Sequence, residues 1–167
     1  MRRQNFKPIF GPVIFDNQDA DFANEIRKTL TADDIAASFQ RAGRETPPDL
    51  PLCDFVAPLE RPSIGGEGST DVGDVSWVTP TVQARVATCA VGTPFHTWQT
   101  VAQGKAPAAH KGMIHAAKVM AATATHLINS PETLQAAREI HDQRQNATPY
   151  VCPIPSGQKP PVIEQPS

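Results

Sequence analysis

The sequence lacks several features that would assign it to familiar classes of protein. It contains no run of about 18 apolar residues, and residues 1–7 lack the apolar segment of a secretory signal. We therefore expect a cytoplasmic protein that binds no membrane. The formal net charge of −2 and the scattered basic residues attract no polyanion, so we expect no nucleic-acid partner either.

Cysteine is scarce as well. The three cysteines, Cys53, Cys89 and Cys152, are odd in number, far apart and without a Cys-x-x-Cys pair. Such a set builds neither a disulfide framework nor a structural zinc knuckle. We interpret all three as small buried hydrophobic residues in a reducing compartment.

Proline, in contrast, is abundant, and eleven of its 17 residues lie in two zones, 47–62 and 149–166. Proline lacks a backbone donor and restricts its neighbours, so these zones should be irregular or extended. We expect an irregular approach over residues 1–15, a folded body over 16–148 and a Pro-rich extended tail over 149–167.

Helical periodicity appears in four segments. Phe22, Ile26 and Leu30 share one face of a helix, and Thr31 with Asp34 is a capping signal for a second helix. Ser130 before Pro131 predicts the start of a last helix. The longest helix should cover about 109–129, and its alanines permit close approach to a sheet. We interpret its apolar stripe as core: Met113, Ala116, Ala117, Met120, Ala121, Ala124, Leu127 and Ile128.

Strands are expected at residues 52–56, 75–78 and 81–91, since these segments are rich in β-forming residues. Helices combined with these strands predict an α/β fold with a mixed sheet. In open α/β folds, ligands bind where strands end and loops begin, so His96, just after the third segment, is a candidate site residue. An ordinary hydrogen-bonded loop histidine remains the alternative.

The glycine-rich turn 68–74 is the second candidate wall of a site. Asp71 and Asp74 lie in this turn, which could present backbone N–H groups and two hydroxyls to a carboxylate, or could simply bend the chain through Asx-type hydrogen bonds. His115 and His126 lie too far apart on one helix to ligate one ion together. His141 should be exposed.

Five segments in order resemble the C-terminal part of a known family. They are GSTDVGDVSW at 68–77, GTPFHTWQ at 92–99, AHKGM at 109–113, AAKVMA at 116–121 and TPYVCPIP at 148–155. The family is the metal-dependent amidohydrolases, which include aminoacylases, hippurate hydrolases and dinuclear zinc carboxypeptidases. The resemblance extends from about Phe10 to about Pro155.

The resemblance implies that residues 16–148 are the C-terminal lobe of a zinc-peptidase-like catalytic domain, with the lid domain absent. His96 then corresponds to the last metal-ligating histidine, while Ser69, Thr70 and Asp71 lie at the substrate wall. The other metal ligands and the glutamate that acts as general base belong to the N-terminal portion of the family. This chain would therefore hold no catalytic residue and only part of a zinc or manganese site.

Family members hydrolyse an amide bond with metal-activated water, and the expected substrate is an N-acyl amino acid or an aminobenzoyl-glutamate. One imidazole binds a metal weakly, because affinity requires three or four converging ligands. We expect negligible activity from the isolated chain. The alternative is a non-catalytic subunit or truncated fragment that assembles with a partner chain carrying the N-terminal metal-binding half.

Overall fold

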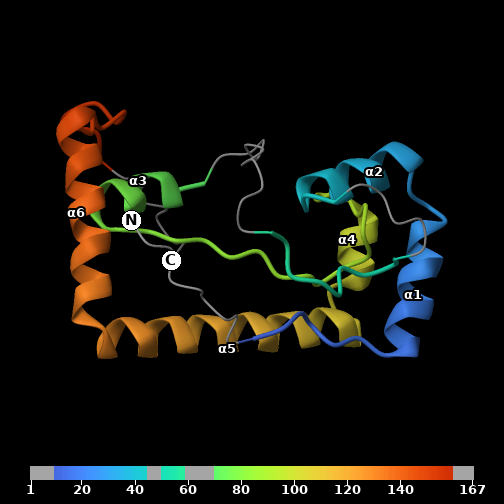
Figure 1. The fold of residues 1–167 in the computed structure, drawn as a ribbon. Coiled ribbons are helices and arrows are strands. Elements are labelled where there is room, and N and C mark those ends of the chain that lie inside the picture. The colour runs from blue at the N-terminus through green and yellow to red at the C-terminus, as the bar shows by residue number, and fades with distance from the viewer. Residues whose placement is uncertain (1–9, 45–49, 59–69, 160–167) are drawn as a thin grey trace, which may run out of the picture. The chain divides into compact units, whose positions relative to one another are not determined.

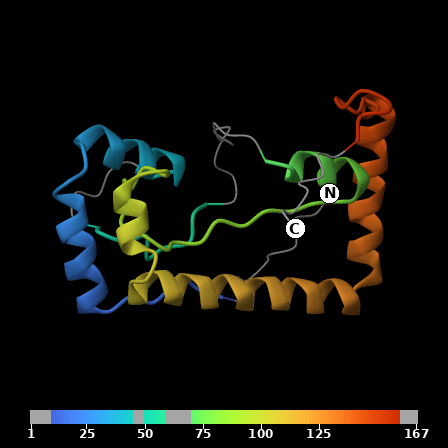
Figure 2. The same cartoon turned by 180° about the vertical axis from the view of Figure 1, so that it is seen from behind.

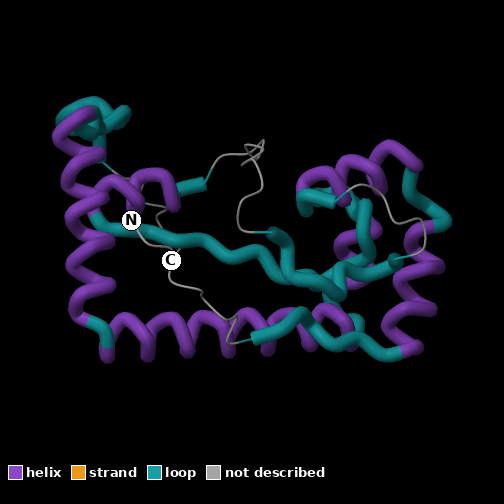
Figure 3. The backbone as a smooth tube through the Cα atoms, viewed as in Figure 1, coloured by secondary structure: helices purple, strands orange, loops and turns teal. Residues whose placement is uncertain are grey.

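The computed structural model describes residues 10–44, 50–58 and 70–159. Within these ranges the chain forms six helices and no strand (Figures 1 and 3). The helices are α1 (Asn17–Arg27), α2 (Ala32–Arg41), α3 (Val72–Val78), α4 (Trp98–Gln103), α5 (Pro107–Asn129) and α6 (Pro131–Ala147). In the described part of the chain, no helix is both long enough and apolar enough to span a membrane.

The predicted α/β fold with a mixed sheet is wrong, because the described residues are helical or irregular throughout. Residues 75–78 belong to α3, and residues 81–91 form a chain segment without ladder partners. Valine and threonine favour strands only where neighbouring strands accept their backbone hydrogen bonds. In the described ranges no segment offers that pairing, so β-propensity alone did not produce a strand.

The chain divides into two compact units. Unit 1 comprises residues 1–68 and 83–129, and unit 2 comprises residues 69–82 and 130–167. In unit 1, Figures 1 and 2 show α1, α2 and α4 gathered around the N-terminal end of α5. Unit 2 contains α3, α6 and the residues that follow α6.

The first two helices both begin with a capping box, of which the sequence predicted the second. At α1, the Asp16 side chain accepts from the Asp19 backbone N–H, and the Asp19 side chain accepts from the Asp16 N–H. Thr31 and Asp34 form the same reciprocal capping box at α2. Each box satisfies two backbone donors that would otherwise have no partner in the first turn. The helix after Ser130 also begins at Pro131, although the Ser130 side chain makes no capping hydrogen bond.

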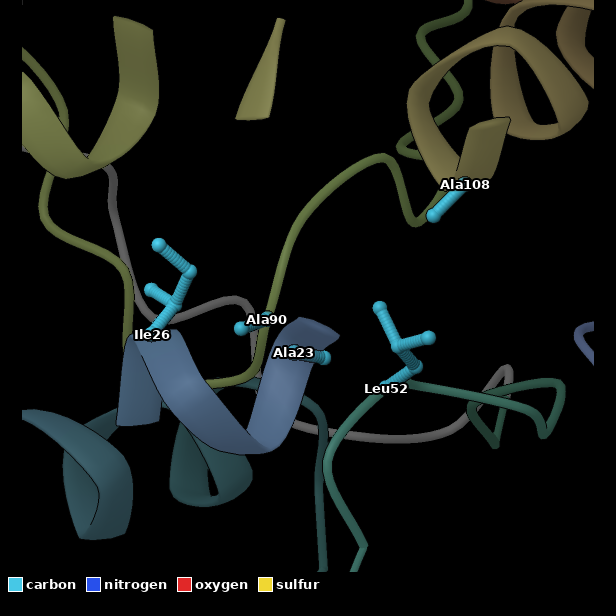
Figure 4. Close-up of a cluster of buried hydrophobic side chains, with 5 residues drawn as sticks. All are labelled: Ala23, Ile26, Leu52, Ala90 and Ala108. Atoms are coloured by element: carbon cyan, nitrogen blue, oxygen red, sulfur yellow. The ribbon is translucent and has the colours of Figure 1, made fainter. Parts of the chain in front are cut away.

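The core of unit 1 is a small cluster of buried apolar side chains (Figure 4). It brings together α1, the segment near Leu52, the segment near Ala90 and the start of α5. Its members are Ala23, Ile26, Leu52, Ala90 and Ala108, with Phe15 packed against them. Phe39 of α2 is also buried, with 1% of its surface exposed.

Two glycines permit close approaches in this unit. A Cβ atom on Gly112 of α5 would lie 2.1 Å from the carbonyl oxygen of Ala87, so only glycine lets the helix approach that backbone. Gly92 has a φ of 97°, and a Cβ there would meet the Ile35 side chain at 2.7 Å. The segment 87–92 is therefore held between α2 and α5.

The apolar stripe of α5 is not the core element that its sequence predicts. Only Ala108 and Gly112 of this helix are buried, while Met113, Met120 and Ile128 are 60%, 70% and 79% exposed. The periodicity correctly predicted the helix. It did not reveal that the described residues leave most of this stripe uncovered.

The cysteines agree with their interpretation in part. None of the three, all within the described ranges, forms a disulfide. Cys89 is partly buried, and this burial raises the pKa of its thiol. Cys152 is exposed, so it is not the buried hydrophobic residue that we expected.

Candidate functional site

His96 lies in the turn that leads into α4, within unit 1. The carbonyl oxygen of Pro94 accepts hydrogen bonds from the hydroxyls of Thr97 at 2.8 Å and Thr100 at 2.7 Å. These two bonds connect the turn to the first residues of the helix. The backbone on both sides of His96 is therefore tied to α4.

The buried side chain of Gln103 also holds this loop in place, through three hydrogen bonds. Its Oε1 accepts from the Ala90 N–H at 2.7 Å, and its Nε2 donates to Thr93 Oγ1 at 3.0 Å and to the Gln99 carbonyl at 3.0 Å. The Thr93 hydroxyl in turn donates to the Ala90 carbonyl at 2.7 Å. Gln103 is only 3% exposed, so water cannot replace these partners cheaply. The network holds the entry of the His96 loop in one conformation.

His96 has a φ of 64°, and it is the one non-glycine residue with a positive φ among those described. This left-handed conformation is uncommon for residues with a Cβ and persists where the surrounding structure imposes it. The residue is exposed. A braced loop thus presents an imidazole to solvent at a conformationally strained position.

The described residues do not fit a complete metal site. No group of three or more His, Cys, Asp or Glu side chains converges in the part of the chain that the structure describes. The exposed imidazole of His96 fits one coordination position of zinc or manganese, both of which accept imidazole nitrogen. Any further ligands would have to come from other residues.

The predicted substrate wall lies in unit 2, whereas His96 lies in unit 1. Ser69 is outside the described residues. The Thr70 hydroxyl accepts from the Val72 N–H at 3.4 Å, and the Thr70 carbonyl accepts from the Gly73 N–H at 3.2 Å. Asp71 precedes α3 without making a side-chain cap, and it is exposed. Thr70 and Asp71 therefore stand at the start of a short helix, where the Asp71 carboxylate faces solvent.

Asp74 has a partner that its sequence position did not predict. The Tyr150 hydroxyl donates to Asp74 Oδ1 at 3.0 Å, and the Tyr150 ring lies 5.7 Å from the Trp77 ring. Hydrogen bonding to Asp74, followed by desolvation, raises the pKa of Tyr150 to about 12. Asp74 therefore fastens the chain after α6 to α3.

Unit 2 also carries a groove of about 390 Å³ between α3 and α6. Trp77, Pro80 and Ile140 line it together with His141 and Arg144. His141 is half-buried rather than exposed as predicted, and its ring nitrogens contact Asp142 at 3.4 Å and Gln145 at 3.2 Å. Both nitrogens of this imidazole are thus engaged within α6.

Lys111 has a structural role that the sequence pattern did not indicate. Its ammonium group donates to Asp16 Oδ2 at 2.6 Å and to Asp19, joining α5 to the cap of α1. The ion pair raises the pKa of Lys111, and the Lys111 hydrogen bond lowers the pKa of Asp16. The AHKGM motif singled out the segment that contains Lys111 but gave no indication of an ion pair. Asp16 and Asp19 are more than 90 residues away in sequence, so spacing along the chain could not identify them as partners.

Comparison with known proteins identifies a relative. The chain is 41% identical over 165 residues to one of the subunits of p-aminobenzoyl-glutamate hydrolase from Escherichia coli (strain K12). The match covers 90% of this chain but 34% of the relative, so the chain spans about a third of that protein's length. No protein-family model and no solved structure matches the chain significantly. The predicted resemblance to the C-terminal part of such a hydrolase is confirmed.

Proposed function

We propose that this chain is the C-terminal part of a metal-dependent amidohydrolase that cleaves the amide bond of p-aminobenzoyl-glutamate or of an N-acyl amino acid. The observation that carries the proposal is the 41% identity to p-aminobenzoyl-glutamate hydrolase over nearly the whole chain. The identity supports a hydrolase role. The proposal adds a metal ion, an amide substrate and metal ligands that this chain does not supply.

In this proposal His96 is one metal ligand. The hydrogen bonds around Pro94 and Gln103 hold its loop, and the strained backbone presents the imidazole outward. A ligand held in place before binding loses little conformational entropy when the metal arrives. When bound, zinc or manganese would supply a Lewis acid and an activated water. The remaining ligands would come from residues outside this sequence.

Ser69, Thr70 and Asp71 are proposed to contact the substrate. The exposed Asp71 carboxylate makes no side-chain cap at α3, so it can accept a hydrogen bond from a substrate amide. The Thr70 hydroxyl already accepts from the Val72 N–H and retains its own proton for donation.

A second candidate is a non-catalytic subunit that assembles with a chain carrying the metal-binding half. The exposed apolar residues of α5 favour it, because an uncovered surface of this kind marks an interaction site. The two candidates differ in whether His96 matters for turnover. In a purely assembling subunit, loss of the imidazole would leave activity unchanged.

A chimeric hydrolase tests the proposal. This chain would replace the matched third of the E. coli relative, and turnover of p-aminobenzoyl-glutamate would be measured with zinc or manganese. We expect activity from the chimera. His96→Ala should reduce turnover by more than the roughly 100-fold that loss of a second-sphere metal partner costs, and should lower bound metal.

The matched control is His110→Ala, which removes another exposed imidazole from unit 1. Turnover by this variant should stay within about twofold of the parent chimera, since surface substitutions rarely change stability or geometry. Equal activity and metal content in His96→Ala and His110→Ala would contradict the metal-ligand assignment. Activity retained in both would favour the assembling subunit.

A further inference from the structure

One face of α5 is apolar, exposed and continuous. Its large side chains, Met113, Ile114, Met120 and Ile128, are 60%, 52%, 70% and 79% exposed. Three exposed alanines lie between them: Ala117, Ala121 and Ala124. At about 100° per residue, these seven positions fall within about 120° of the helix circumference. We call these seven residues the α5 face.

The α5 face has the dimensions of a helix-packing surface. It runs from Met113 to Ile128, about 22 Å along the axis at about 1.5 Å per residue. Its members repeat at spacings of three, four and seven residues, which is the pattern of a seam that faces a partner. Small alanines in the middle allow a close approach, while methionine and isoleucine supply apolar area.

The internal contacts of α5 are made elsewhere on the helix. Gly112 and Ala108 are its buried residues, and the Lys111 ammonium reaches Asp16 at the cap of α1. In its first turns, α5 therefore contacts the rest of unit 1 through the side opposite to the α5 face. The α5 face itself takes no part in the buried cluster.

The match to the hydrolase indicates what covers this face. About two thirds of the E. coli relative has no counterpart in this chain, since the match covers 34% of it. Permanent interfaces are more apolar than transient ones, and a seam made entirely of apolar residues is of the permanent kind. We propose that the α5 face docks on the part of the hydrolase polypeptide that lies outside this match. The inference rests on the proposed function and names the partner surface that it requires.

Co-expression of two separate polypeptides tests the docking without any activity assay. One is this full chain, and the other is the part of the E. coli relative that lies outside the match. We expect a complex on size-exclusion chromatography. Met120→Glu and Ala124→Glu should each weaken it by more than about tenfold in Kd, because docking would bury an unpaired carboxylate.

Thr123→Glu is the matched control. It adds the same charge to an exposed position of the same helix, outside the α5 face. Its Kd should stay within about twofold of the parent. A complex unaffected by Met120→Glu and Ala124→Glu, or no complex with the parent chain, would overturn the proposal. A homodimer of this chain that these two substitutions dissociate would overturn it too, since the occupant would then be a second copy.

Methionine oxidation gives a readout that needs no substitution. Met113 and Met120 should react readily with hydrogen peroxide in the free chain and at least about tenfold more slowly in the complex. Equal oxidation in the two states would contradict docking on this face even if a glutamate variant failed to fold. In metal-free buffer, His96→Ala should leave both docking and protection unchanged, which separates failure of docking from failure of the metal assignment.

Discussion

The two units differ in what holds their candidate site residues. All eight buried apolar residues of the described chain belong to unit 1: Val13, Ala23, Ile26, Phe39, Leu52, Ala90, Val91 and Ala108. The described part of unit 2 has none. The His96 loop thus follows Ala90, which belongs to the buried cluster and donates its N–H to the buried Gln103 side chain. The Thr70–Asp71 segment begins a seven-residue helix without buried residues.

This difference indicates how each position is determined. Buried hydrogen bonds and close packing have few alternative arrangements, so they fix the His96 loop within its own unit. Exposed hydrogen bonds such as Tyr150 to Asp74 compete with water and are weaker constraints. We therefore expect the geometry of Asp71 to depend on what packs on unit 2, and that of His96 to depend little on it.

Removing the largest buried side chain should have the largest effect. We expect Phe39→Ala to lower the free energy of unfolding of unit 1 by about 3–5 kcal/mol, because the cavity cannot fully collapse. Phe95→Ala, at a position that is 72% exposed, should change it by less than about 0.5 kcal/mol. Urea denaturation followed by Trp98 fluorescence in a Trp77→Phe background reports on unit 1. Equal losses in the two variants would show that unit 1 has no effective core.

Breaking the buried network under the His96 loop should cost less. Gln103→Ala leaves the Ala90 N–H without its acceptor, at a cost of about 1–3 kcal/mol. The matched control is Gln99→Ala, which loses one exposed bond to Thr29. Hydrogen exchange at the Ala90 amide should accelerate in Gln103→Ala alone. Unchanged exchange would mean that Gln103 does not brace the loop.

Two glycine-to-alanine substitutions should change the stability of the two units in opposite directions. Gly112→Ala should destabilise unit 1 by about 1 kcal/mol, since overpacking of about 1–3 kcal/mol exceeds the helix-propensity gain of about 1 kcal/mol. Gly73→Ala in α3 meets nothing within 4 Å and should stabilise unit 2 by up to about 1 kcal/mol. Thermal unfolding of each variant, followed by Trp98 or Trp77 fluorescence, measures both. Stabilisation by Gly112→Ala would refute the close approach to Ala87.

The smallest effect concerns the surface bond of unit 2. The neutral Tyr150 hydroxyl donates to Asp74, so the folded pKa of about 12 exceeds the ordinary tyrosine value of 10.0. Its stabilising contribution is complete below pH 10 and is lost as pH rises from 10 towards 12. Tyr150 is the single tyrosine of the chain, so tyrosinate absorbance reports it directly.

Asp74→Asn should lower the pKa of Tyr150 towards its ordinary value, because the charged acceptor is the largest cause of the shift. Asp71→Asn, which alters a neighbouring carboxylate of the same segment, should leave the titration unchanged. A pKa that is the same in all three proteins would show that the bond does not persist in solution.

Local signals in the sequence predicted four of the six helices, α1, α2, α5 and α6, but neither α3 nor α4 and no other part of the fold. Capping residues such as Thr31 and Pro131 act within three or four positions, so they identified helix starts. Residues 75–78 and 81–91 were assigned to strands on side-chain preference, but strand formation depends on partners that the described chain does not supply. Gln103 carried no signal, because its role depends on contacts with a loop ten or more residues away.

The sequence by itself determined four of the six helices and, through its ordered motifs, the kinship with a hydrolase, while His96 as a site residue stays a prediction. These depend on residue type and short-range spacing, which a linear chain carries completely. Only the tertiary structure decided that His96 occupies a strained, braced turn, that Lys111 joins α5 to α1, and that the α5 face is exposed. Burial and long-range hydrogen bonds depend on which distant segments of the chain come into contact. Residue periodicity predicts that a helix has an apolar face, but it does not predict which residues cover that face.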